Sequence, residues 1–251
     1  MTDAPAAAVR SSATRRRRDW RDGGRTVKPW DEPVLAISLV TLGLSLLLAA
    51  VIRGLSPAPS AWIVADLVVL LGLVVASVLA FMKARPRPLL TLRPVDLVFG
   101  LAAGLLLRVM QGALAVAAGG DGAFPSYAPL VESTGTAWSA VAVLAQVIVA
   151  PTVEEVFLRG VLLVTAYSVA RRVGGRAAAV WAALAISVLG SIAVHSWNSG
   201  VSWEAWATPL AVGLVTGMMV LLTGRLGAAV VAHVTFALSF AALALIGAVV
   251  G

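Results

Sequence analysis

Few side chains in the apolar stretches of this chain can act as acids, bases or metal ligands. His195 and His233 are the only histidines, and both lie in apolar runs, as does the acidic pair Glu154 and Glu155. One glutamate and two imidazoles are the minimum set for activating a water by general-base chemistry and stabilising the oxyanion that results. Glu154, His195 and His233 are equally a three-ligand set for a divalent metal such as zinc. Both chemistries remain open from residue types alone.

The two adjacent acids are expected to do different work. On a helix Glu155 and Arg159 stand at i and i+4, where opposite charges pair across one turn. Glu154 points about 100° away from Glu155, because a helix has 3.6 residues per turn. The spacing therefore predicts that Glu154 is the acid left for chemistry, with Glu155 and Arg159 as supporting residues. The alternative is that both acids only brace helices through salt bridges.

The composition sets the class of protein in which this chemistry would occur. Of the 251 residues, 60% are hydrophobic and 12% are charged, against roughly 45–50% and about 25% in soluble domains. A soluble enzyme and a disordered chain are thereby excluded, and a polytopic all-α membrane protein is predicted. The chain has no cysteine, which also excludes a thiolate metal site and a cysteine nucleophile.

Long apolar runs follow Pro33, each close to the ~20 residues that cross a bilayer. The fourth is too long for one straight span, and Pro151 within it predicts a kink or a break, since proline lacks a backbone donor and clashes with the preceding turn. We therefore expect a bundle of seven or eight transmembrane helices. The runs cover 34–52, 61–82, 95–118, 137–168, 177–197, 205–222 and 226–250.

The basic residues are unevenly placed. Residues 1–33 hold eight of the nineteen lysines and arginines and are predicted to be a disordered basic cytoplasmic arm, with the transmembrane bundle at 34–251. The remaining basic loops alternate with less basic ones, which predicts a multi-pass protein of the cell (inner) membrane with a cytoplasmic N-terminus. We accordingly interpret the net charge of +7 as a sign that the protein contacts membrane lipids, and not that it binds nucleic acid.

Two further features bear on helix packing. Asp66 and Arg108 lie on different predicted helices and are expected to pair across the bundle, because an ionisable group inside a membrane needs a partner or a purpose. A role in a polar substrate path is the alternative for this pair. Gly100 and Gly104 form a GxxxG pair, which allows close contact between helices.

The Glu-Glu-x-x-x-Arg block at 154–159, His195 about forty residues later, and His233 in a glycine-rich last helix resemble the CPBP family. These are CAAX-prenyl-protease-like intramembrane endopeptidases, also called the Abi family. The resemblance covers about 137–240, which it marks as the catalytic core. It implies hydrolysis of peptide bonds in peptide or membrane-protein substrates. In that activity Glu154 activates the water with help from His195, and His233 helps to hold the oxyanion. Both a metalloprotease and a metal-free glutamate mechanism are described for such proteins.

Two positions depart from the family's usual pattern. Ser191 stands where the family usually has phenylalanine, and Ala237 stands where it usually has asparagine or a similar residue. Loss of one oxyanion donor costs roughly 2.7–4 kcal/mol of transition-state stabilisation. The alternative function is therefore a catalytically impaired scaffold or immunity-type partner. A proton-coupled transporter is a third possibility, less favoured because the sequence shows no inverted repeat.

The rise of a helix per residue predicts how deep each candidate site residue lies in the membrane. At ~1.5 Å per residue, Glu154 and His195 are roughly 25–28 Å from the basic loop at 169–176, whereas His233 is about 12 Å from the basic turn before its helix. We expect the 160–176 segment to project beyond the membrane, with a broken helix or separate sites as the alternatives.

Overall fold

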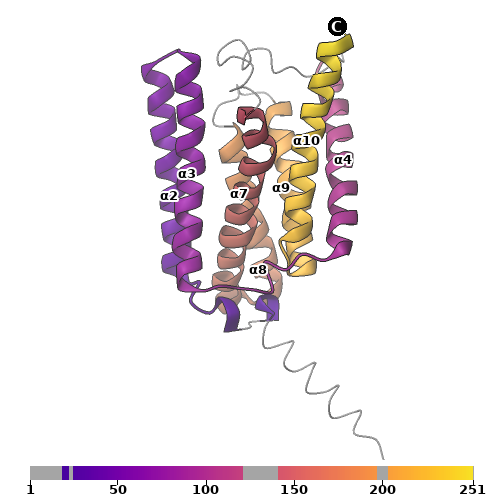
Figure 1. Ribbon diagram of the computed structural model, residues 1–251. Coiled ribbons are helices and arrows are strands. Elements are labelled where there is room, and N and C mark those ends of the chain that lie inside the picture. The colour runs from indigo at the N-terminus through magenta and orange to yellow at the C-terminus, as the bar shows by residue number, and fades with distance from the viewer. Residues whose placement is uncertain (1–18, 23–24, 121–140, 197–202, 251) are drawn as a thin grey trace, which may run out of the picture.

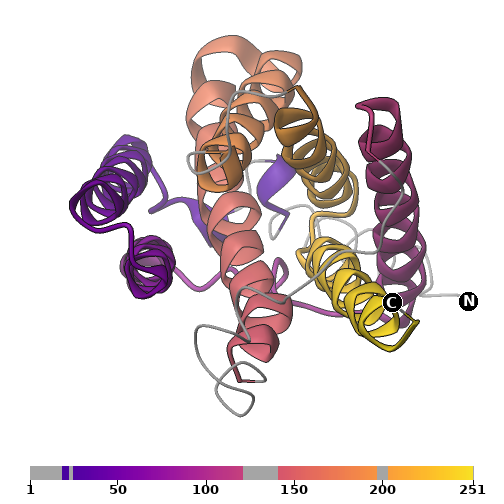
Figure 2. The same cartoon turned by 90° about the horizontal axis from the view of Figure 1, so that it is seen from above.

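The computed structural model describes residues 19–22, 25–120, 141–196 and 203–250. This part of the chain is all-helical, as predicted, and contains no strand. Viewed along the bundle, α2 and α3 form a pair on one side, α4 and α10 a pair on the other, and α7, α8 and α9 lie between them (Figures 1 and 2). The elements are η1 Trp20–Asp22, η2 Arg25–Val27, α2 Glu32–Leu55, α3 Pro59–Lys83, α4 Pro94–Ala117, η3 Ala145–Val149, α7 Ala150–Glu155, η4 Val156–Leu162, α8 Leu163–Ser196, α9 Trp203–Thr223 and α10 Gly227–Val250.

Six segments of the described chain are long and apolar enough to cross a membrane. The longest, Val141–His195, has 55 residues, more than twice the ~20 that one crossing needs. It bends at Gly175, whose φ of +73° is readily adopted only by glycine. Beyond the bend α8 folds back, and Ser187 Oγ donates to Leu158 O at 2.9 Å. With both arms counted, the described segments give seven crossings, so the chain is a multi-pass membrane protein within the predicted range.

The irregularity expected near Pro151 is present, but the helix neither ends nor breaks there. Backbone dihedrals at Val149 and Ala150 remain right-handed helical. The turn before the proline is a π-helix, η3, in which Ala150 N–H donates to Ala145 O. This wider turn accommodates a residue that has no N–H and whose ring would clash with the carbonyl four residues earlier. A second π-helix, η4, follows directly after Glu155.

The glycine pair on α4 lies against α10, the helix that carries His233. A Cβ added at Gly100 would lie 2.5 Å from Val231 Cβ, and one added at Gly104 would lie 2.5 Å from Ala232 O. The two backbones approach this closely because neither glycine has a side chain, as the GxxxG spacing predicted. The small-residue contact therefore sets the position of α10 relative to its neighbour.

Gly104→Ala should destabilise the protein by about 1–3 kcal/mol, the usual cost of overpacking a close contact. Gly112→Ala on the same helix is the matched control, because a Cβ there meets nothing within 4 Å. That variant should be neutral or gain up to about 1 kcal/mol from helix propensity. Unfolding of the two purified variants in detergent measures the difference; equal midpoints would show that Gly104 does not set the helix contact.

The prediction of a disordered arm over residues 1–33 is wrong for the part that the structure describes. Trp20 and Trp30 are buried, and their indole N–H groups donate to Gly224 O at 3.1 Å and to Ala80 O at 2.8 Å. The charge-rich composition of the whole segment concealed these two anchors, whose amphipathic rings suit such a position. Residues 1–18 and 23–24 lie outside the described residues.

Basic residues that are distant in sequence gather at one end of the bundle. Arg21 donates to carbonyls at the C-terminal end of α9, and Arg172 pairs with Glu32 at 3.0 Å. Arg225 pairs with Asp96 at 2.6 Å, and the hydrogen bond to that carboxylate raises the pKa of the Arg225 guanidinium. The contacts place the N-terminal segment, the bend in α8 and the α9–α10 turn at the same end, as the loop charges led us to expect.

Candidate active site

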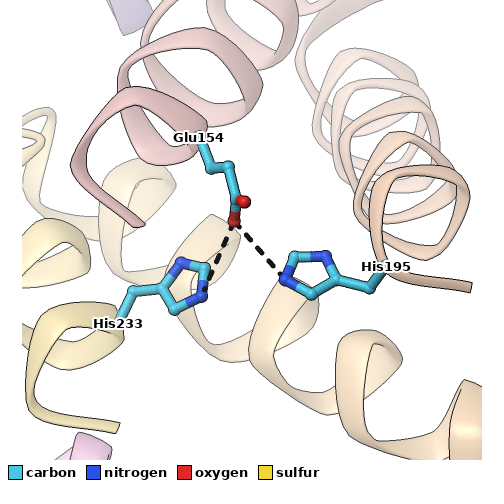
Figure 3. Close-up of side chains that lie close together, drawn as sticks. All are labelled: Glu154, His195 and His233. Atoms are coloured by element: carbon cyan, nitrogen blue, oxygen red, sulfur yellow. Dashed lines mark ion pairs between the residues drawn. The ribbon is translucent and has the colours of Figure 1, made fainter. Parts of the chain in front are cut away.

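Glu154, His195 and His233, which come from α7, α8 and α10, lie close together with their side chains directed toward one another (Figure 3). His195 Nε2 is 3.4 Å from Glu154 Oε2, and His233 Nε2 is 3.8 Å from the same oxygen. One ligand atom from each of the three residues lies within 4.8 Å of the others. The three residues chosen from the sequence for their chemistry therefore occupy one site.

The three site residues meet although Glu154 and His195 are many more residues away from the basic end of the bundle than His233 is. Figure 1 shows α8 extending past the level at which α10 begins. Near that end of α8, the Tyr167 hydroxyl donates to Arg21 O at 2.9 Å in the N-terminal segment. The longer path from Glu154 is thus taken up by helix that extends beyond α10, and neither a broken helix nor separate sites is required.

Glu155 orients one of the two imidazoles. Its Oε1 lies 2.9 Å from His233 Nδ1 and 3.3 Å from Arg159 Nη1. Because an ionised carboxylate only accepts hydrogen bonds, the Nδ1 of His233 carries the proton of this contact. His233 Nε2 consequently faces Glu154. The i,i+4 pairing with Arg159 is confirmed, whereas this link across 78 residues of sequence was not predicted.

Backbone geometry orients the second imidazole in the same way. His195 Nδ1 lies 3.0 Å from Ser191 O, one turn earlier on α8. A carbonyl oxygen cannot donate, so Nδ1 is the protonated nitrogen and Nε2 is directed at Glu154. Both rings therefore present Nε2 to the same carboxylate oxygen.

Arg159 is fully buried, as are Glu155 and Ser191. Its Nη2 donates to Ser191 Oγ at 3.2 Å, and a Cβ added at Gly213 would lie 3.4 Å from the same nitrogen. The small hydroxyl at 191 and the glycine at 213 thus provide the room and one acceptor for a buried guanidinium. Serine at position 191 is therefore compatible with the braced site and does not disrupt it.

Two cavities meet at the Glu154 carboxylate, whose side chain is 14% exposed. One, of about 210 Å³, lies toward α4 and α10; the other, of about 370 Å³, lies toward α3. Both are lined by Gln146, Glu154 and His195. The larger has a mainly apolar wall, while the smaller also exposes Arg108 and His233. A chain lying across Glu154 would therefore meet different surroundings on its two sides.

The predicted pair of Asp66 and Arg108 is wrong. Arg108 contacts α10 instead, with Nε donating to Ser239 Oγ at 3.1 Å and Nη2 to Phe236 O at 2.5 Å. Asp66 lines the larger cavity and Arg108 the smaller one, because α3 and α4 lie on opposite sides of α7. Sequence reasoning overlooked Gln146, which lines both cavities together with Glu154; the π-helix η3 contains it and changes the spacing of helical faces there.

The donor set fits a divalent metal. Two imidazoles with Nε2 directed inward, each fixed through Nδ1 by an acceptor, are typical of metal-ligating histidines. Separations of 3.4 and 3.8 Å to the shared oxygen suit ligands that each bind zinc at about 2.0–2.2 Å in tetrahedral geometry. Glu154 Oε2 is buried and accepts no hydrogen bond from the described protein atoms. A cation, or a water that donates to it, would satisfy that oxygen.

Comparison with known proteins gives one match. Residues 136–239 match the family model described as type II CAAX prenyl endopeptidase Rce1-like. No curated protein and no solved structure matches the chain. The matched segment contains Glu154, His195 and His233, and it agrees with the resemblance read from the same residues. Over residues 136–239 this membrane protein is therefore similar to the type II CAAX prenyl endopeptidases of the Rce1-like family.

Proposed function

We propose that the protein is an intramembrane endopeptidase in which a water activated by Glu154 hydrolyses the peptide bond. The observation that carries the proposal is the common orientation of the two imidazoles. Each is held through Nδ1, by Ser191 O and by Glu155 Oε1, so that Nε2 is directed at the Glu154 carboxylate. A hydrolytic site requires polar groups that are already oriented toward the reacting water. Side chains that only hold helices together have no such requirement.

The roles follow from the fixed hydrogen bonds. Glu154 Oε2 accepts a proton from water while the water oxygen attacks the carbonyl carbon. His195 Nε2 accepts the second hydrogen of that water and so fixes its direction. His233 Nε2 lies 3.8 Å from the same Glu154 oxygen, and a proton on this nitrogen would be donated in a hydrogen bond to the oxyanion. The proton on Glu154 passes to the leaving amine as the C–N bond breaks.

The same three side chains would hold a divalent metal, with zinc as the natural candidate from the donor set. A bound metal would supply Lewis-acid polarisation and a more acidic water. In that case Glu155 and the Ser191 carbonyl keep their function, which is to fix the two rings through Nδ1. Metal analysis of protein purified without chelator, with cleavage assayed before and after chelation, decides between the two mechanisms.

Replacing either histidine tests the shared site. His195→Ala and His233→Ala should each lower cleavage of a reporter membrane protein in proteoliposomes by about 10²-fold or more, the usual contribution of a general acid or base. Bound metal, if present in the parent, should fall in both variants. Trp181→Ala is a suitable control, since this residue is also on α8 but is 71% exposed. Parental rates in both histidine variants would contradict the proposal.

We further propose that the protein lies in the cell (inner) membrane with its basic end on the cytoplasmic side. Its proposed substrates are peptides or membrane proteins. The positive-inside rule supports this orientation, and the apolar wall of the larger cavity supports a membrane-derived substrate. The second candidate, a non-catalytic scaffold, is favoured by Ala237, which lines the smaller cavity with a methyl group. It predicts that Glu154→Gln is silent in cells while substitutions on exposed helix faces disrupt partner binding.

A further inference from the structure

A groove of about 400 Å³ runs along α3 where this helix faces α7 and η4 (Figure 1). None of the three candidate catalytic residues lines it, and the hydrolysis proposed above gives it no function. Two of its wall residues are 51% and 77% exposed, so the groove opens on the outer surface of the bundle, which acyl chains cover in a membrane. Its apolar wall consists of Val74, Val78, Phe81 and Met82 on α3, with Val153 and Val156 opposite.

The two hydroxyl groups in the groove are already used. Ser77 Oγ donates to Leu73 O at 2.8 Å, and Thr152 Oγ1 donates to Ile148 O at 2.6 Å, each to a carbonyl one turn earlier on its own helix. An extended peptide in this groove would have backbone N–H and C=O groups without partners, which is costly within a membrane. The wall therefore suits a hydrocarbon chain better than a polypeptide.

One end of the groove carries a cation. Arg85, two residues beyond the end of α3, lines the groove, is exposed, and belongs to no ion pair among the described residues. This is the basic end of the bundle, because the indole of Trp30 in the N-terminal segment donates to Ala80 O at 2.8 Å. The same indole packs edge-on against Phe81, with the ring centroids 5.5 Å apart. The groove thus passes from an apolar wall to a guanidinium at the end that holds the charged loops.

We propose that this groove binds one acyl chain of an anionic phospholipid whose phosphate pairs with Arg85. The wall alone cannot select a lipid, since all lipid tails are similarly apolar. Selection comes from the head group, because guanidinium forms charge-assisted hydrogen bonds to phosphate oxygens. The orientation proposed above also places this end in the cytoplasmic leaflet, which is rich in anionic lipids. The bound chain would pack against Val153 and Val156, which flank the two acids of α7 in sequence.

Photolabelling tests the site on the full-length protein in detergent micelles. The probe is phosphatidylglycerol with a photoreactive group in one acyl chain, and it should label peptides that contain residues 74–82 or 152–156. Unlabelled phosphatidylglycerol should compete at least about fivefold better than phosphatidylcholine with the same chains, which is the fold-change for ~1 kcal/mol per basic residue at a membrane surface. Glycerol phosphate, which has the charge but no acyl chain, should not compete.

Arg85→Gln should reduce the preference for the anionic lipid to about one, and Arg85→Lys should retain part of it. Arg87→Gln is the matched control, because it removes one charge from the same loop at a residue that does not line the groove. Equal losses in Arg85→Gln and Arg87→Gln would show attraction to the charge of the whole loop and would overturn the proposal. So would equal competition by the two lipids in the parent protein.

A second pair of variants tests the groove itself. Val78→Phe places a larger side chain in the groove and should lower labelling of the groove peptides several-fold. Val75→Phe, at a residue on the same helix that is 43% exposed and does not line the groove, should leave labelling unchanged. Helicity and thermal unfolding of each variant check the fold.

Three results would overturn the acyl-chain site. Undiminished labelling in Val78→Phe would show that the chain lies elsewhere. Even labelling of all the exposed helices would show ordinary contact with the surrounding lipid. The absence of labelling at the groove would show that protein closes it, as a second copy of the chain or a bound substrate would. None of these results bears on cleavage, so the lipid site and the endopeptidase function succeed or fail separately.

Discussion

Glu154→Gln should lower the rate of peptide-bond cleavage by about 10²–10⁴-fold, the range that one general base contributes. Glutamine keeps the shape of the side chain but cannot take the proton from water, so the loss reflects chemistry and not packing. The carboxylate is only 14% exposed, and the fold should be retained. Cleavage of a reporter membrane protein in proteoliposomes, with helicity and thermal unfolding measured on the same samples, gives the result.

The matched control is Asp66→Asn, which neutralises another carboxylate on the wall of the larger cavity. It should change the cleavage rate far less, because Asp66 is not one of the three residues whose ligand atoms lie within 4.8 Å of one another. A rate for Glu154→Gln close to that of the parent would remove Glu154 from the chemistry and favour the scaffold function. Equal losses in both variants would point to the charge of the cavity and not to a proton acceptor.

Arg159→Met should destabilise the protein by about 3–5 kcal/mol, because it leaves a fully buried acid without its guanidinium. Glu155 and Arg159 are both inaccessible to solvent and only 3.3 Å apart, and methionine approximates the length of the lost side chain. Glu155→Gln/Arg159→Met should lose less than the two single variants combined, since neither charge then remains. Unfolding in detergent measures all three variants.

The exposed pair of Arg172 and Glu32 provides the comparison. Its atoms are 3.0 Å apart, but the side chains are 47% and 61% exposed. Arg172→Met should therefore cost no more than about 1 kcal/mol. Similar losses for Arg159→Met and Arg172→Met would mean that burial does not strengthen the inner pair, and that the guanidinium is not what stabilises the region around the site.

The sequence was a good guide where regular periodicity governs the structure. Apolar run lengths predicted the helices, and the i,i+4 rule predicted the contact between Glu155 and Arg159. The rarity of ionisable groups in lipid directed attention to Glu154, His195 and His233 because each such group is costly there. These inferences depend on local spacing or on composition, both of which can be read without knowing the fold.

Other features depended on contacts between distant segments or on departures from regular geometry. The π-turns of η3 and η4 change the helical phase around Glu154, and a 3.6-residue period cannot predict them. The link from Glu155 to His233 joins helices 78 residues apart. Asp66 and Arg108 were expected to pair because both are costly in lipid, but the sequence did not reveal that α7 lies between their helices.

The tryptophan anchors of the N-terminal segment have a consequence for how the molecule is made. Trp20 is synthesised early, yet its acceptor, Gly224 O, lies 204 residues later. At about 5–20 residues per second, a ribosome needs roughly 10–40 s to reach that position. Throughout that time the Trp20 indole lacks its native hydrogen-bond acceptor. Trp30 can reach its acceptor, Ala80 O, after only 50 further residues, whereas the Trp20 contact can form only after most of the hydrophobic chain has been synthesised.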